Sequence, residues 1–152
     1  MDSNLKNTLQ HILPAAISWA QQQAAEVLAH GTPLDAAEQQ MARQVGVAAP
    51  DKVRLVMVPH MPVPSAPDLR LVALETGLLG PMTIGLALGH AVLICHGQRS
   101  KRLLSHELRH VYQYEQAGSI AAYLPQYLQQ IAEVGYFNAP FEADARAHEI
   151  RD

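Results

Sequence analysis

SHELRHVYQYEQAG, residues 105–118, contains two histidines four residues apart, and a glutamate directly follows the first. An α-helix turns by about 100° per residue, so His106 and His110 share one face, roughly 6 Å apart along the axis. At that spacing two imidazoles can reach one metal ion. Glu107 lies about 100° around the helix, where it cannot easily join the same ligand set but can contact a water bound there. The stretch therefore predicts a metal-binding helix.

The alternative is a surface helix that happens to be rich in histidine. The chain has eight histidines in 152 residues, so a chance pair at this spacing is not rare. A chance pair with a glutamate in the second position, inside a well-marked helix, is much rarer, and this favours the metal site. Arg109 places a charge between the histidines, which departs from the usual motif, and we expect its side chain to point to solvent.

The rest of the chain has the pattern of an α+β protein. Helical spacing of apolar residues, with glycine or proline at the ends, predicts helices over 3–30, 33–45, 99–117, 119–134 and 139–150. Thr32 and Pro33 have the pattern of an N-cap followed by the first helical residue. Apolar and β-branched runs predict a strand over 53–58 and a strand or bent hairpin over 84–94. Residues 68–79 are consistent with a short helix.

Composition limits the classes of function. A chain of 152 residues predicts one domain. Its composition, 49% apolar and 16% charged with a net charge of -3, is typical of a soluble protein and gives no basic surface for nucleic acid. The single cysteine, Cys95, excludes an internal disulfide and an all-cysteine metal site. Residues 1–19 lack a basic start and a long apolar run, which predicts no signal peptide, no membrane segment and a cytoplasmic protein.

A catalytic zinc ion usually has three protein ligands and one open position, so another element should supply a third ligand. Glu142, in the first turn of the last predicted helix, is the first candidate because a carboxylate there is compatible with the helix dipole. Glu149 shares its face about 10 Å further along and is the second candidate. Asp144 is about 200° from Glu142 and would face elsewhere, and Glu115 faces away from the histidines on their own helix. Glu133 stays open.

Three segments together resemble the gluzincin metallopeptidases, which combine His-Glu-x-x-His with a glutamate on a following helix. The similarity is greatest to the very short members, the minigluzincins, and to small bacterial proteins that share their layout. The segments are GLALGHAVLI (85–94), LLSHELRHVYQYEQAG (103–118) and GYFNAPFEADA (135–145). They cover most of the C-terminal half of the chain, and the N-terminal helices carry no such pattern.

This resemblance implies one Zn²⁺ per chain, held by His106, His110 and Glu142, with Glu107 as general base and acid. It implies a small mixed β-sheet backed by helices, in which 84–94 is the active-site strand. The single domain, 1–152, would then consist of N-terminal helices over 1–46 and a zincin-like core over 47–152.

The expected function is that of a small zinc-dependent peptidase whose substrate is a peptide or protein. An extended peptide would pair with the edge of strand 84–94, and Tyr136, which shortly precedes Glu142, is our candidate donor to the oxyanion. The alternative is a non-catalytic metal-binding or interaction domain on the same scaffold. Glu107 favours the enzyme, whereas a chain too short to build a deep cleft favours the alternative. A further hypothesis is that the first two helices cover the cleft and keep the enzyme latent.

Overall fold

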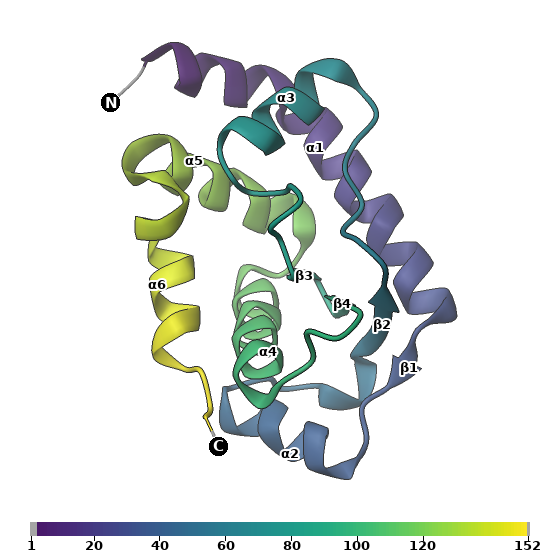
Figure 1. Cartoon of the computed structure of the whole chain (residues 1–152). Coiled ribbons are helices and arrows are strands. Elements are labelled where there is room, and N and C mark those ends of the chain that lie inside the picture. The colour runs from purple at the N-terminus through teal and green to yellow at the C-terminus, as the bar shows by residue number, and fades with distance from the viewer. Residues whose placement is uncertain (1–2, 152) are drawn as a thin grey trace.

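The computed structural model describes residues 3–151, in which helices lie on both faces of a small four-stranded sheet (Figure 1). The helices are α1 (Ser3–His30), α2 (Ala36–Gln44), α3 (Pro67–Glu75), α4 (Lys101–Ala117), α5 (Ile120–Asn138) and α6 (Pro140–Ala147). The strands are β1 (Thr32–Pro33), β2 (Arg54–Val58), β3 (Gly85–Leu88) and β4 (Ala91–Cys95), and a 3₁₀ turn, η1, spans Pro50–Lys52. The expected α+β class is confirmed.

The sheet is mixed, and its strand order is β1-β2-β4-β3. β2 and β4 are parallel, whereas β1 pairs with β2 and β3 pairs with β4 in antiparallel fashion. The segment predicted as a strand or bent hairpin is the β3–β4 hairpin, whose turn contains Gly89 at a φ of 66°. This topology leaves one side of β3 free of strand partners, at the edge of the sheet.

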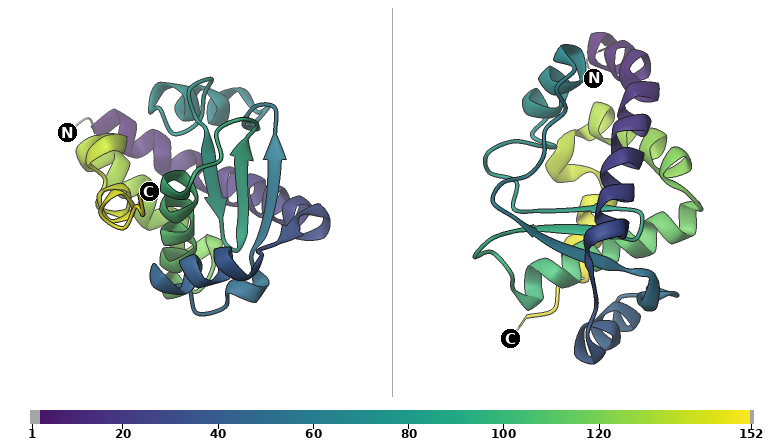
Figure 2. Two further views of the ribbon diagram at one scale, coloured as in Figure 1. Left: turned by 60° about the horizontal axis from the view of Figure 1, so that its bottom comes forward. Right: turned by 90° about the vertical axis from the view of Figure 1, so that its right-hand side faces the viewer.

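Helices cover both faces of the sheet, as the two views in Figure 2 show. Side chains of β4 alternate between these faces, as a pleated strand requires. Val92 and Ile94 pack with α2 and α4, and Ala91 and Leu93 pack with α1 and α5. α1 is therefore part of the core, and its buried residues are Leu9, Ile12, Ala20, Ala24 and Val27.

The predicted start of the second helix is wrong. Thr32 and Pro33 form β1 and pair with Leu55 and Arg54 of β2, and the Thr32 hydroxyl donates to the Leu55 carbonyl at 3.2 Å. α2 begins after Asp35, whose carboxylate accepts from the amide of Glu38, while the Glu38 side chain accepts from the amide of Asp35. This reciprocal capping box satisfies two free amides, which a lone threonine cap cannot do.

α5 is broken at the residue where the sequence predicted the end of a helix. Gly135 has a φ of 85° and a ψ of 166°, which turns the chain inside α5. α6 then starts at Pro140, where the missing amide proton costs nothing because the first amides of a helix have no partner. No helix among the described residues is long and apolar enough to cross a membrane.

Candidate metal centre

The position of α4 follows from its sequence. The Ser100 hydroxyl caps its first turn by accepting from the amide of Leu103, and Gly118, at a φ of 99°, ends it. Leu104 and Leu108 form part of its apolar face, which is buried against the sheet. The histidines lie on a neighbouring face, which is turned toward α6.

His106, His110 and Glu142 converge at one point between α4 and α6. One ligand atom from each lies within 4.8 Å of the others, so the three could hold a metal ion. Nε2 of His106 is 3.2 Å from one oxygen of Glu142, and Nε2 of His110 is 3.0 Å from the other. Two imidazole nitrogens and one carboxylate oxygen form a donor set typical of a catalytic metal site with one open position. Glu142, the first candidate for third ligand, thus lies with the histidine pair.

The other nitrogen of each imidazole is held by a side chain on the outer side of the cluster. Nδ1 of His106 is 2.9 Å from Glu149, and Nδ1 of His110 is 2.8 Å from Oε1 of Gln113. In a neutral ring such an acceptor places the hydrogen on Nδ1 and leaves the lone pair of Nε2 directed at the centre. Outer partners of this kind orient metal-binding histidines in proteins.

Gln113 is itself fixed in one orientation. Its amide nitrogen donates to the carboxylate of Asp144 and to the carbonyl of Phe141, both at 2.9 Å. Its oxygen therefore faces His110, and the hydroxyl of Tyr123 donates to the same oxygen at 2.9 Å. Residues of α4, α5 and α6 thus fix one histidine ring together.

Two expectations from the sequence are corrected by these contacts. Arg109 does not point to solvent, because its guanidinium binds both oxygens of Asp144, at 2.8 and 3.2 Å, and the carbonyl of Val45. Bidentate pairing of this kind holds α4 to α6. Glu149, the second candidate for third ligand, lies behind His106 and also accepts from Arg102, so it supports the site from outside.

The remaining acidic candidates lie elsewhere. Glu115 accepts from the backbone amides of Ala48 and Ala49 and binds His90 at 2.9 Å. Glu133 accepts from Gln129 on the exposed side of α5. Neither belongs to the cluster of His106, His110 and Glu142.

Electrostatics at the site favour positive charge on the two histidines. Burial alone raises the pKa of Glu142, but hydrogen bonds from His106, His110 and Tyr127 outweigh it and lower that pKa well below its usual range. Burial also opposes charge on His106, yet Glu142 and Glu107 together raise its pKa to about 9. The two carboxylates thus stabilise positive charge at the point where the Nε2 atoms meet.

Glu107 is buried beside this cluster, at the inner end of a pocket. Burial raises the pKa of its carboxyl, and nearby His110 and His106 lower it to a smaller extent. No hydrogen bond of this carboxylate is found among residues 3–151. Its Oε2 lies against the backbone of Gly85 in β3, where an added Cβ would come within 2.8 Å. The group is therefore placed at the sheet edge and is not tied to another side chain.

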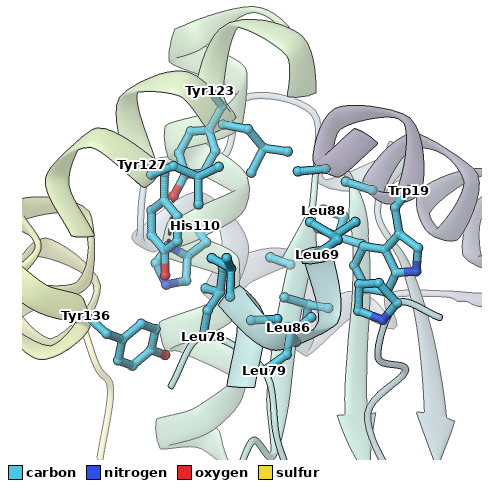
Figure 3. Close-up of a pocket in the computed structure, with 18 of the residues that line it drawn as sticks. Trp19, Leu69, Leu78, Leu79, Leu86, Leu88, His110, Tyr123, Tyr127 and Tyr136 are labelled. Atoms are coloured by element: carbon cyan, nitrogen blue, oxygen red, sulfur yellow. Dashed lines mark hydrogen bonds between the residues drawn. The ribbon is translucent and has the colours of Figure 1, made fainter. Parts of the chain in front are cut away.

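Tyr136, the predicted oxyanion donor, lines the same pocket from α5, directly after the break at Gly135. Its hydroxyl points into the pocket (Figure 3). Burial, followed by the charges of Glu142 and Glu107, raises the pKa of this hydroxyl, which keeps it protonated as a donor. Its catalytic role stays a prediction.

Three residues of the site were not predicted from the sequence. Gln113 is three residues after His110, a spacing that puts the two on one helical face. This spacing could have identified Gln113 as a partner of His110. Tyr127 donates to Oε2 of Glu142 at 2.6 Å from another helix, and no local pattern marks it. The close approach of Gly85 to Glu107 likewise depends on the tertiary fold.

The resemblance to a peptidase family also stays a prediction. Comparison with protein-family models, with curated proteins and with solved structures finds no match for this chain. The three segments that carry the resemblance nevertheless meet at the site. Segment 85–94 contains the β3–β4 hairpin except its last residue, 103–118 lies mostly in α4, and 135–145 contains Tyr136 and Glu142.

Proposed function

We propose that this protein is a zinc-dependent peptidase of the gluzincin type, with His106, His110 and Glu142 as ligands. The observation that carries the proposal is the convergence of both Nε2 atoms on Glu142, with the unpaired carboxylate of Glu107 beside them. Imidazole and carboxylate donors suit zinc, and three protein ligands leave one position open for chemistry. A bound zinc ion would lower the pKa of water and polarise a carbonyl group.

Residues of the chain would carry out the proton transfers. Glu107 accepts a proton as water attacks the scissile carbonyl, and then gives it to the leaving amine. The raised pKa of Glu107, caused by burial, makes it a stronger base than an exposed glutamate. Tyr136, which lines the same pocket from α5, donates a hydrogen bond to the oxyanion.

The free side of β3 would align the substrate. An extended peptide added there forms main-chain hydrogen bonds with an edge strand, whatever its sequence. Gly85 and its neighbours in β3 line the pocket beside Glu107, so a peptide in this position brings its backbone to the site.

The Glu107→Gln variant tests the proposal. We expect it to bind zinc as the parent does, because residue 107 is not a ligand, and to lose peptide hydrolysis by about 10²-fold or more, because glutamine cannot accept the proton. Zinc content and cleavage of a generic protein substrate are measured on the same samples. Glu133→Gln, the same change on the exposed side of α5, serves as the control. Equal cleavage by the Glu107→Gln variant and the parent would refute the mechanism.

A second candidate function is non-catalytic metal binding. Burial of the cluster favours this function, since the side chains of His110 and Glu142 are only 8% and 4% exposed. A parent protein that binds zinc tightly and cleaves no peptide under any condition would support this function over the peptidase.

A further inference from the structure

α5 brings two tyrosine hydroxyls to the candidate metal centre. Tyr123 and Tyr127 are four residues apart, which places them on one face of the helix. Tyr123 donates to Gln113, behind His110, whereas Tyr127 donates directly to Oε2 of Glu142. Both rings lie beside His110 (Figure 3). This part of α5 lies outside the three segments that resemble the gluzincins, so the resemblance does not account for these contacts.

The hydrogen bond from Tyr127 to Glu142 is short, and its donor is held in place. Its length of 2.6 Å is in the range of a hydroxyl that donates to an ionised carboxylate, a class about twice as strong as neutral hydrogen bonds. The Tyr127 ring is buried, stacks with Tyr123 at a centroid distance of 5.5 Å and meets the His110 ring edge-on at 6.3 Å. Packing therefore fixes the hydroxyl, and the hydroxyl restrains the carboxylate.

The two oxygens of Glu142 have different surroundings. Oε1 is 3.2 Å from Nε2 of His106. Oε2 is 3.0 Å from Nε2 of His110 and also accepts from Tyr127. The hydrogen bond from Tyr127 takes one of the lone pairs of Oε2 and opposes rotation of the carboxylate. Oε1 is therefore the better placed metal ligand.

The number of bonds from this carboxylate decides whether a metal ion keeps an open position. A carboxylate can bind a metal ion through one oxygen or through both. One oxygen, together with His106 and His110, gives three protein ligands and leaves the fourth tetrahedral position for water or substrate. A second oxygen would take that position.

We propose that Tyr127 is a positioning residue that holds Oε2 of Glu142 away from the metal, so that only Oε1 binds. The inference rests on the proposed function, because it requires a metal ion at this centre, but it does not require peptide cleavage. Its new element is a residue of α5 that sets how a ligand on α6 binds the metal.

Removal of the hydroxyl tests this role without relying on turnover. Tyr127→Phe keeps the packed ring and loses the hydrogen bond to Glu142. Co²⁺ binds the same nitrogen and oxygen donors as zinc, and it absorbs visible light more strongly with four ligands than with five or six. We expect the variant to lose much of the visible absorption per bound cobalt, because both oxygens of Glu142 then bind. An unchanged spectrum would overturn the inference.

Tyr114→Phe is the matched control. Tyr114 is also buried and stacks on Tyr123 at a centroid distance of 3.8 Å, but its hydroxyl has no hydrogen-bond partner among residues 3–151. We expect this variant to keep the cobalt spectrum of the parent. An equal loss of absorption in both variants would show an effect of packing and would overturn the role of the Tyr127 hydroxyl.

The zinc-loaded parent decides alone if Tyr127→Phe does not fold or takes up no metal. A crystal structure with Oε1 of Glu142 at about 2.0–2.2 Å from zinc, and with Oε2 still bound to Tyr127, would support the inference. Two oxygens of Glu142 on the metal, or Oε2 alone, would overturn it.

Peptide cleavage, measured on the same samples, separates this inference from the proposed function. A parent in which only Oε1 binds zinc, but which cleaves no peptide, would support the role of Tyr127 and refute the peptidase. Zinc-dependent cleavage by a parent in which both oxygens bind would overturn the role of Tyr127 and leave the peptidase standing. A chain that takes up no zinc would overturn both.

Discussion

Gly85 is the residue on which the position of the proposed base depends. The Glu107 carboxylate lies so close to the β3 backbone that a Cβ at residue 85 would be 2.8 Å from Oε2 of Glu107 and 2.9 Å from Cδ1 of Leu103. An alanine would push the carboxylate away from its position. The three atoms nearest to such a Cβ belong to Glu107 and Leu103, and none belongs to a proposed metal ligand.

We expect Gly85→Ala to reduce peptide hydrolysis at least about tenfold while zinc content stays unchanged, because a shift of about 1 Å in a catalytic group can cost up to 10²-fold. Gly80→Ala is the control, since its added Cβ would meet only Leu74, at an ordinary 3.6 Å. Zinc per chain and the initial rate of cleavage are measured for both variants. A rate equal to the parent's in Gly85→Ala would show that the carboxylate position is not set by this contact.

Single residues were predicted where the motif is local. His106, Glu107 and His110 lie within one turn of one helix, so the period of the helix alone places them. Arg109 was misplaced because its partner, Asp144, lies on another helix, and no local pattern predicts that pairing. The sequence therefore indicated the proposed ligands and not the side chains that orient them.

At the scale of elements, Gln113 connects three helices to the candidate metal site. It joins His110 on α4, Tyr123 on α5 and Asp144 on α6 through hydrogen bonds of 2.8 to 2.9 Å. Removing its amide leaves the imidazole without its outer partner and leaves polar groups unsatisfied inside the protein. Such outer partners typically contribute about 10- to 100-fold to metal affinity.

Gln113→Leu should accordingly weaken zinc binding by about 10- to 100-fold and lower the free energy of unfolding by about 1–3 kcal/mol. Competition with a chelator measures the first quantity, and denaturant unfolding of the metal-free protein measures the second. Gln126→Leu is the matched control, because Gln126 is exposed on α5 and bonds only to a carbonyl in its own helix. Unchanged zinc affinity in Gln113→Leu would show that His110 needs no partner on Nδ1.

The long helices and the hairpin could be predicted from the sequence, whereas the shortest strand could not. Long amphipathic helices and the apolar hairpin follow from periodicity, and Gly135 was identified as the end of a helix. β1 was missed because it has only two residues and exists through its pairing with β2. A strand of that length carries no periodic pattern, so only the tertiary fold defines it.

At the scale of the whole molecule, α1 is a structural helix rather than a removable cover. It crosses the face of the sheet opposite to α4 and packs against α5, burying Leu9, Ile12 and Val27 (Figure 2). Each such side chain contributes roughly 1.5–3 kcal/mol when fully buried. Their sum is a large part of the 5–15 kcal/mol that typically stabilises a domain.

Deletion of residues 1–31 should therefore unfold the protein instead of activating it. We expect the truncated chain to aggregate or to lose cooperative thermal unfolding, as measured by circular dichroism and gel filtration. The latency hypothesis, in which the N-terminal helices only cover the cleft, predicts a folded chain with faster peptide cleavage. That outcome would contradict the structural role of α1.

The pocket is the feature that the sequence could least reveal. Its walls come from α1, α3, β3, α4 and α5, which are far apart in the chain and meet only in the folded molecule. The chain was expected to be too short to supply the walls of a deep cleft. α1 and α3 supply them instead.

Zinc content per chain tests the central claim most directly. The protein is supplied with zinc at neutral pH, passed through gel filtration and analysed for metal, beside the variants His110→Ala and Glu142→Ala. We expect about one zinc per parent chain, as for a single three-ligand site, and a large loss in both variants. A ratio near zero in the parent, or an unchanged ratio in both variants, would contradict it.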